Sequence, residues 1–309
     1  MLHRLETVPT PWQSGPFRVR AHRLLFGQTY EDSGIELRAF KPHSRVFAIS
    51  GAGYTARALA AAGHRVTTVD IDPDQLAYAK SRAEGQPRQA GTAEQLLAFG
   101  RSMARLAGWT QRKLVDFLAL SDCAKQIEYW DERLDTSVWR ATVDTLLAPR
   151  LLRLCYAAPL AASLPDGFGS RIRQRLRRGW ASHPNRSNPY AAALMLGTAP
   201  VDPGPSAIPI QFVCADAAEF LESCPPSTYD AFALSNIGDG ASQAYRIRLR
   251  NAVEHAAAPN AIVVSRTFAE PRPDTTTNWA ALDRSMLWGA VCVGAIATFG
   301  EGGKPCSIC

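Results

Sequence analysis

The chain has 309 residues, of which 46% are hydrophobic and 20% are charged, and its formal net charge is +6. This composition is that of a globular protein and argues against extensive disorder. No run of about 18 apolar residues is present, which argues against a membrane-spanning helix. Residues 1–20 lack the apolar core of a secretory signal, and the seven cysteines follow no regular pattern, so we expect a reduced, cytoplasmic protein.

The first recognisable unit is a strand, a glycine loop and a helix, after a lead-in over residues 1–44. Val46–Ile49 is an apolar run that predicts a buried strand. Gly51 and Gly53 follow it, and a helix is expected over 55–62, with Gly63 just beyond its end. Glycines at the carboxyl end of a strand let a ligand approach the backbone closely, and open α/β sheets bind ligands at that edge.

A second strand, over residues 65–70, ends in the acidic residue Asp70. A carboxylate at this position can accept hydrogen bonds from ribose hydroxyls. Asp72 is the expected N-cap of the next helix, with Pro73 at its first position and Gln75 placed to complete a capping box. The order of strand, GxG loop, helix, strand and acid predicts a site for an adenosine-containing cofactor.

A long block, from about residue 86 to 200, has Trp, Leu and Arg at helical spacing. We expect it to be a helical insertion that could contain one further strand. It would form the pocket for the acceptor, the molecule that reacts with the cofactor. Its most basic run would place Arg171, Arg175 and Arg178 on one helix face. We interpret this face as solvated; the alternatives are an acidic acceptor, a membrane surface and, last, nucleic acid.

Strands resume in the last third of the chain, over residues 211–215, 229–234, 261–268 and, in one or two pieces, 287–299. A helix over 242–257 is expected to end at Pro259-Asn260. Because strands and helices alternate, residues 45–309 are predicted to form one α/β domain, with a mostly parallel sheet of the Rossmann-like, class I methyltransferase type.

The cofactor is expected to be S-adenosylmethionine rather than NAD. An NAD site favours GxGxxG and an open helix N-terminus for the pyrophosphate, but Ala56 and Arg57 stand where the third glycine would be. S-adenosylmethionine carries no phosphate. Asp216 follows a strand at the place for a contact with adenine, and Ser235 and Asn236 end a strand that would face the sulfonium. The expected cofactor-binding residues are Glu31, Asp32, Ser50, Gly51, Ala52, Gly53, Asp70, Ile71, Asp216, Ala217, Ser235 and Asn236.

Four groups of residues resemble the 3-amino-3-carboxypropyl transferases that use S-adenosylmethionine, a family that includes the betaine-lipid enzyme acting on diacylglycerol and isonocardicin synthase. They are residues 26–32, residues 48–53 with 69–76, Asn188-Pro189-Tyr190 with Leu196-Gly197, and residues 234–240 with 261–266. The Ser-Asn-Ile-x-Asp element over residues 235–239 is the most specific. Asp72 departs from the Asn that is frequent in the family. The chain is also shorter than the lipid enzymes, which favours a soluble small-molecule acceptor.

The resemblance implies that an acceptor nucleophile, such as a phenol, attacks the γ-carbon of the methionine arm and that methylthioadenosine leaves. Glu31 and Asp32 are the candidates to hold the amine, although Asp32 could instead cap a helix over 33–39. Asp239 is the first candidate for the general base, with a helix cap as its equal alternative. The other candidates for the base are Tyr190, Tyr30 and His183.

Other functions stay open at this point. They are a methyltransferase on the same fold, a diacylglycerol 3-amino-3-carboxypropyl transferase and a non-catalytic module that binds an adenosyl ligand. No metal is expected, because the CxxC spacing of Cys306 and Cys309 lacks a second pair of ligands nearby, and we interpret these residues as free thiols. Nucleic acid is not expected as a partner, and membrane contact is expected only for a lipid acceptor.

Overall fold

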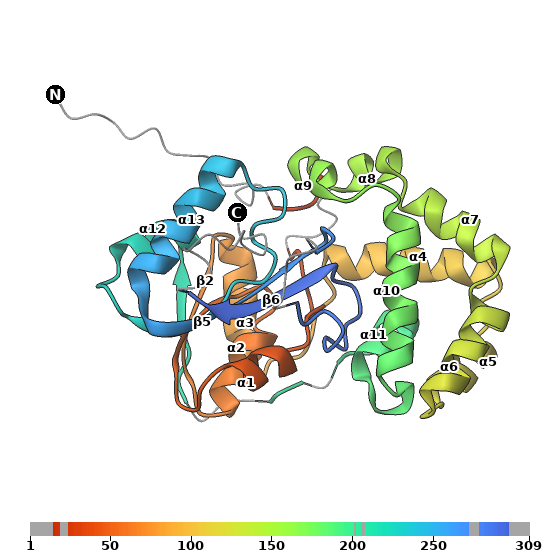
Figure 1. Cartoon of the computed structure of the whole chain (residues 1–309), viewed down its shortest axis with the longest axis horizontal. Coiled ribbons are helices and arrows are strands. Elements are labelled where there is room, and N and C mark those ends of the chain that lie inside the picture. The colour runs from red at the N-terminus through yellow and green to blue at the C-terminus, as the bar shows by residue number, and fades with distance from the viewer. Residues whose placement is uncertain (1–14, 19–23, 201, 205–207, 272–277, 297–309) are drawn as a thin grey trace.

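A six-stranded sheet forms the centre of the α/β part of the molecule (Figure 1). The computed structural model describes residues 15–18, 24–200, 202–204, 208–271 and 278–296. The strand order is β3-β2-β1-β4-β5-β6, with β6 antiparallel to β5 and the other neighbours parallel. The strands are β1 (Arg45–Ile49), β2 (Arg65–Asp70), β3 (Gln211–Cys214), β4 (Tyr229–Ala233), β5 (Ala257–Thr267) and β6 (Ala290–Ala295). The expected Rossmann-like, mostly parallel fold is confirmed.

Helices cover both faces of the sheet because its central strand is apolar on both sides. Phe47 of β1 packs into a cluster with α12 and α13, whereas its neighbours Val46 and Ala48 pack into a second cluster with α1 and α2. This alternation follows from the two-residue period of a strand. The helices around the sheet are α1 (Gly34–Ala39), α2 (Tyr54–Ala61), α3 (Pro73–Ala83), α12 (Ala217–Ser223) and α13 (Gln243–Ala256).

The block between α3 and β3 is helical and lies beside the sheet (Figure 1). Its elements are α4 (Thr92–Leu106), α5 (Gln111–Leu118), α6 (Cys123–Tyr129), η1 (Trp130–Leu134), α7 (Ser137–Leu146), α8 (Pro149–Cys155), α9 (Ala158–Ser163), α10 (Phe168–Ser182), η2 (Asn185–Ser187) and α11 (Pro189–Leu196). It has a core of its own, which includes Trp109, Trp130, Trp139 and Trp180. All of residues 86–200 are described, and they add no strand to the sheet.

One detail of the predicted C-terminal half is wrong. Pro259 and Asn260 do not end the helix: α13 ends at Ala256, and both residues lie inside β5. The β4–β5 register shifts there, so that Ala257 and Ile262 pair with positions only two residues apart on β4. A bulge of this kind accommodates a proline because it needs no ladder hydrogen bond. Of the stretch 287–299, one strand, β6, lies in the described part; residues 297–299, Cys306 and Cys309 lie outside it.

Candidate functional site

The glycine loop after β1 leaves an open space in front of Gly51. Gly51 and Gly53 have φ values of +48° and +75°, a region that favours glycine. A Cβ on Gly53 would lie 3.1 Å from the Cβ of Ala79, so this glycine permits close packing against α3. A Cβ on Gly51 would have no atom within 4 Å. The buried Ser50 hydroxyl beside it has no hydrogen-bond partner in the described chain. The loop therefore fits a ligand that approaches Gly51.

Asp70, at the end of β2, faces the same loop. Its carboxylate accepts hydrogen bonds from the backbone N–H groups of Gly51, at 3.1 Å, and Asp72, at 3.0 Å. Burial raises the pKa of Asp70 to about 7, against the opposing effect of these hydrogen bonds. The side chain is therefore fixed beside the glycine loop, where it can accept hydrogen bonds from a ribose, and Ile71 follows it directly in the chain.

Nucleoside binding should depend on pH through Asp70. Ribose hydroxyls donate to the ionised carboxylate, and ionisation requires a pH above a pKa of about 7. We expect the Kd of methylthioadenosine, which has no group titrating in this range, to fall by at most about tenfold per unit as the pH rises from about 6 to about 8. Isothermal titration calorimetry should show a flat profile for Asp70→Asn. A slope that survives in this variant would contradict the assignment.

Gly51→Ala should weaken nucleoside binding at little cost to the rest of the fold. The new methyl group would enter the open space in front of the loop, and φ at +48° is unfavourable for alanine. We expect Kd to rise by about tenfold or more, with a loss of about 1 kcal/mol in the free energy of unfolding. Gly85→Ala is the matched control, because Gly85 also has a positive φ and open space but lies beyond α3. Equal effects of both variants on Kd would count against a ligand at Gly51.

Gln75 and Glu94, which were not predicted as site residues, hold residues 24–32 over the glycine loop. Residues 24–32 are here called the strap. The Gln75 amide accepts hydrogen bonds from the N–H groups of Leu25 and Phe26 and donates to the carbonyls of Phe26 and Gly51, at 2.9–3.2 Å. Glu94 of α4 accepts hydrogen bonds from the strap at the N–H of Gly27 and from its own helix N-terminus. The expected capping box is therefore wrong: Asp72 does cap α3, but the Gln75 side chain bonds to the strap.

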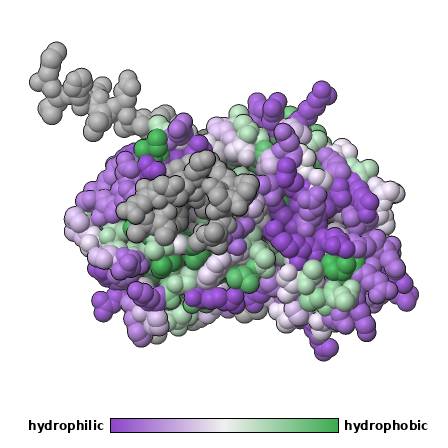
Figure 2. All heavy atoms as spheres, viewed as in Figure 1, coloured by the Kyte–Doolittle hydropathy of each residue, from purple (hydrophilic) through white to green (hydrophobic). Residues whose placement is uncertain are grey.

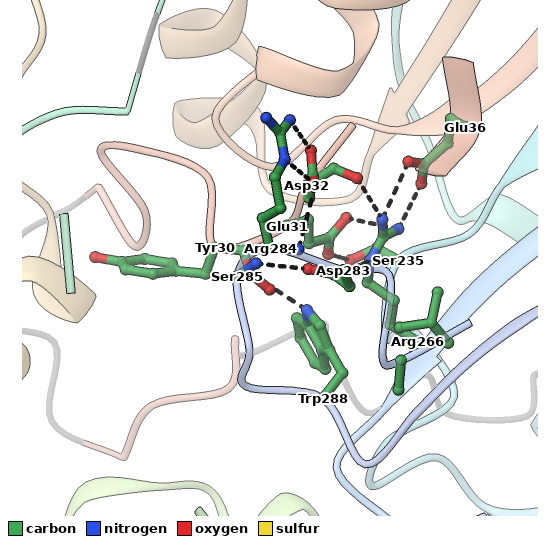
Figure 3. A network of polar contacts seen from close by, with 12 residues as sticks. Tyr30, Glu31, Asp32, Glu36, Ser235, Arg266, Asp283, Arg284, Ser285 and Trp288 are labelled. Carbon is green, nitrogen blue, oxygen red and sulfur yellow. Dashed lines mark hydrogen bonds and ion pairs between the residues drawn. The ribbon is translucent and has the colours of Figure 1, made fainter. Parts of the chain in front are cut away.

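The strap carries Glu31 into a buried cluster of charges (Figure 3). The Glu31 carboxylate accepts a hydrogen bond from the Ser235 hydroxyl and lies 3.4 Å from the Arg266 guanidinium. Ser235 has a φ of +53°, a conformation that a non-glycine residue adopts only when its surroundings hold it. Burial raises the pKa of Glu31. The strap therefore contacts the end of β4 through Glu31 and Ser235, two of the residues expected to bind the cofactor.

This cluster contains more carboxylates than cations. Four acidic residues surround two guanidinium groups in Figure 3: Glu31, Asp32, Glu36 and Asp283 around Arg266 and Arg284. Arg266 is fully buried and pairs with Glu36 and with Asp283, the latter at 3.1 Å. Burial raises the pKa of Asp283 as well as that of Glu31. Negative charge that is not balanced by cations favours the binding of an ammonium group.

The Asp32 carboxylate already forms an ion pair within the protein, with Arg284. Arg284 donates two hydrogen bonds of 2.6 Å to its carboxylate, and Gly34 donates a third from the start of α1. Burial opposes ionisation of Asp32, but Arg284 outweighs it, so the pKa of Asp32 lies below its ordinary value. The Arg284 guanidinium also lies 5.5 Å from the ring centre of Tyr190. Glu31 is therefore better placed than Asp32 to bind a ligand amine.

Neither tyrosine is suited to act as a base. The Tyr30 hydroxyl donates a hydrogen bond of 2.6 Å to Glu94, and its ring points away from the charge cluster (Figure 3). Burial raises the pKa of Tyr30 and that of Tyr190. His183, the other alternative, lies at the C-terminal end of α10, and burial lowers its pKa.

Asp239, in the loop after β4, ties this loop to the end of β5. Its carboxylate accepts hydrogen bonds from the Thr267 hydroxyl at 2.6 Å, the Phe268 N–H at 3.0 Å and the Asn236 amide at 3.4 Å. Burial raises its pKa. The alternative that Asp239 caps the next helix is wrong, because Ser242 is the N-cap of α13. Asp239 therefore belongs to the same edge of the sheet as Ser235.

Asp216 has a structural role that needs no ligand. It is the N-cap of α12, where it accepts hydrogen bonds from the N–H groups of Ala218 and Glu219, and its other oxygen accepts one from the Tyr245 hydroxyl. The buried Ala217 follows it. Both residues lie at the carboxyl end of β3, next to that of β2. An adenine contact at Asp216 stays a prediction.

The basic face of α10 is not solvated. Arg175 is buried and donates hydrogen bonds to the carbonyls of Phe268 and Leu287. Arg178 donates to the carbonyl of Trp288, and Arg171 pairs with Glu270. The arginines therefore attach the insertion to the segments that follow β5, and the solvated face expected from the sequence is wrong. Helical spacing correctly placed these residues on one face but could not show what that face contacts.

Comparison with known proteins adds one match. A family model described as "Methyltransferase domain" matches residues 49–104, which run from the end of β1 through the glycine loop and Asp70 into α4. No curated protein and no solved structure matches. In the described ranges, no three His, Cys, Asp or Glu residues are grouped so as to hold a metal, and no helix could span a membrane. Residues 49–104, which include the glycine loop and Asp70, are therefore similar to a methyltransferase domain, and this similarity supports an S-adenosylmethionine-dependent transferase.

Proposed function

We propose that this protein transfers the 3-amino-3-carboxypropyl group of S-adenosylmethionine to a hydroxyl of a small-molecule acceptor, such as a phenol. The observation that carries the proposal is a continuous set of contacts from Glu31 through Ser235 and Asn236 to Asp239. Glu31 can hold the ammonium end of the methionine arm. Asp239 can take the proton of the acceptor hydroxyl. Because both belong to one set, a base at Asp239 would act from the side on which Glu31 would hold the methionine arm.

The chemistry needs little more from the protein. The bond from the acceptor oxygen to the γ-carbon forms as the bond from that carbon to sulfur breaks, and methylthioadenosine leaves with the electron pair. The sulfonium is a good leaving group and needs no acid. Holding the oxygen and the γ-carbon in line can supply several of the ~7–11 kcal/mol that positioning makes available. The resemblance of residues 235–239 to the Ser-Asn-Ile-x-Asp element of the family supports the same reaction.

A methyl transfer is the second candidate, and the match of residues 49–104 to a methyltransferase domain favours it. The same loop and the same Asp70 would then bind the co-substrate, and the acceptor would face the methyl group. The two reactions differ in which carbon is attacked, so a label on each carbon distinguishes them.

The test uses two samples of S-adenosylmethionine, one labelled in the methyl group and one in the carboxyl group of the methionine arm. Each is incubated with the purified protein and candidate phenols and alcohols. Our proposal expects only the carboxyl label in the acceptor. Transfer of the methyl label alone would establish a methyltransferase and refute the proposal. Binding of S-adenosylmethionine without transfer of either label to any acceptor would favour a non-catalytic binding module.

A further inference from the structure

The helices α8 and α9 present a surface that is apolar and positively charged at once. Residues 146–165, here called the α8–α9 surface, contain seven leucines and two arginines and no acidic residue. Leu152 and Leu160 are buried and attach the segment to the protein. Leu151 and Leu154 are 37% and 60% exposed. Figure 2 shows small hydrophobic areas between hydrophilic ones where these helices reach the surface.

The charges of this surface lie around the exposed leucines. Arg150 and Arg153 are exposed, and neither makes an ion pair with another described residue. About one turn of helix separates Arg150 from Arg153, and likewise the two exposed leucines from each other. All four side chains therefore lie on the outward side of α8, opposite Leu152. Arg18, also exposed, donates a hydrogen bond to the carbonyl of Arg153 and adds a third positive charge.

We propose that the α8–α9 surface docks the protein on the surface of an anionic lipid bilayer. Leucines flanked by arginines fit the boundary between acyl chains and anionic headgroups, where apolar burial and electrostatic attraction add. A protein partner would need acidic groups around an apolar centre; a bilayer supplies this arrangement everywhere. This inference does not depend on which group the protein transfers.

Docking would bring the candidate site close to the lipid. A Cβ on Gly240, the residue after Asp239, would lie 2.8 Å from the Cα of Leu160, so the loop after β4 touches α9 directly. The loop that holds the proposed base is therefore next to the docking surface. If docking is observed, hydroxyl lipids become the first acceptors to test in place of soluble phenols.

The test is flotation of the full chain with vesicles of phosphatidylcholine alone and of phosphatidylcholine mixed with phosphatidylglycerol. We expect binding to the mixed vesicles only, and weaker binding as salt is added. Replacing both Arg150 and Arg153 by Gln should weaken binding by about thirtyfold, and replacing both Leu151 and Leu154 by Ser by at least about tenfold. Leu106→Ser is the matched control, since Leu106 is 80% exposed on α4, and it should bind as the wild type does.

Three results would overturn the proposal: no binding to either vesicle, equal binding to both, or unchanged binding of the leucine variant. All substitutions are at exposed positions, so their melting temperatures should match that of the wild type, and this check separates loss of docking from loss of folding. A concentration-dependent dimer that the leucine variant abolishes, without vesicle binding, would assign the surface to a second copy of the chain instead.

Discussion

Asp239→Asn is expected to slow group transfer by about 10²–10⁴-fold, the range for loss of a general base, with the Kd of S-adenosylmethionine unchanged within about twofold. Asparagine has the shape of the carboxylate: its one oxygen can still accept the hydrogen bond from the Phe268 N–H, and its NH₂ group can donate to the Thr267 hydroxyl, but it cannot take a proton. Single-turnover rates with an excess of protein over labelled co-substrate would measure the effect on the transfer step.

The pH profile provides an independent check on Asp239. Burial raises its pKa, and the base must be ionised, so the transfer rate should rise with pH through a value above the ordinary range for aspartate. This increase of the transfer rate with pH should disappear in Asp239→Asn. Asp230→Asn is the matched control: Asp230 lies on β4, the strand that precedes the Asp239 loop, in an exposed pair with Arg45, and its replacement should leave both rate and profile unchanged. If binding collapses in Asp239→Asn while turnover per bound complex stays the same, Asp239 is a binding residue.

Glu31→Gln is expected to weaken binding of S-adenosylmethionine by about ten- to a hundredfold, the range for a hydrogen bond to a charged group. Methylthioadenosine lacks the ammonium group and should bind as before. Removing one of the four clustered carboxylates reduces their mutual repulsion, so the fold should survive. Calorimetric titration of each ligand into the same protein preparation would measure the ratio of the Kd of S-adenosylmethionine to that of methylthioadenosine.

Asp32→Asn is the control for this prediction. Asp32 is held by Arg284, so its loss should lower the melting temperature but leave the ratio of the two affinities unchanged. If Asp32→Asn removed the discrimination and Glu31→Gln did not, the ammonium site would have to be reassigned to Asp32. Equal losses for both ligands in Glu31→Gln would show that this residue only supports the strap.

The sequence predicts the first half of the sheet well because the signals there are local. Val46–Ile49, Gly51 and Asp70 lie within 25 residues of one another. They are recognised in the sequence as an apolar run, a glycine at a turn and an acidic residue at a strand end. Gln75 shows the limit of local reasoning. Its spacing from Asp72 matches a capping box, but its partners in the strap lie 49 and 50 residues away, and nothing in the local pattern indicates them.

The charge cluster could be anticipated only in part. The resemblance of residues 26–32 and 235–239 to one family indicated that Glu31 and Ser235 belong to one site. It could not show that Asp32 pairs with Arg284, which is 252 residues away and has no motif around it. The same holds for α10: helical spacing placed its arginines on one face, but the carbonyls that they bind follow β5 and depend on the tertiary fold.

The nucleoside product is the most direct test of the central claim. The purified protein is incubated with S-adenosylmethionine and an extract of the cells that produce it, and the nucleosides are identified by mass spectrometry. We expect methylthioadenosine, together with an acceptor that has gained the mass of the 3-amino-3-carboxypropyl group, and neither product with Asp239→Asn. S-adenosylhomocysteine as the nucleoside, with an acceptor that has gained a methyl group, would contradict the claim and establish a methyltransferase.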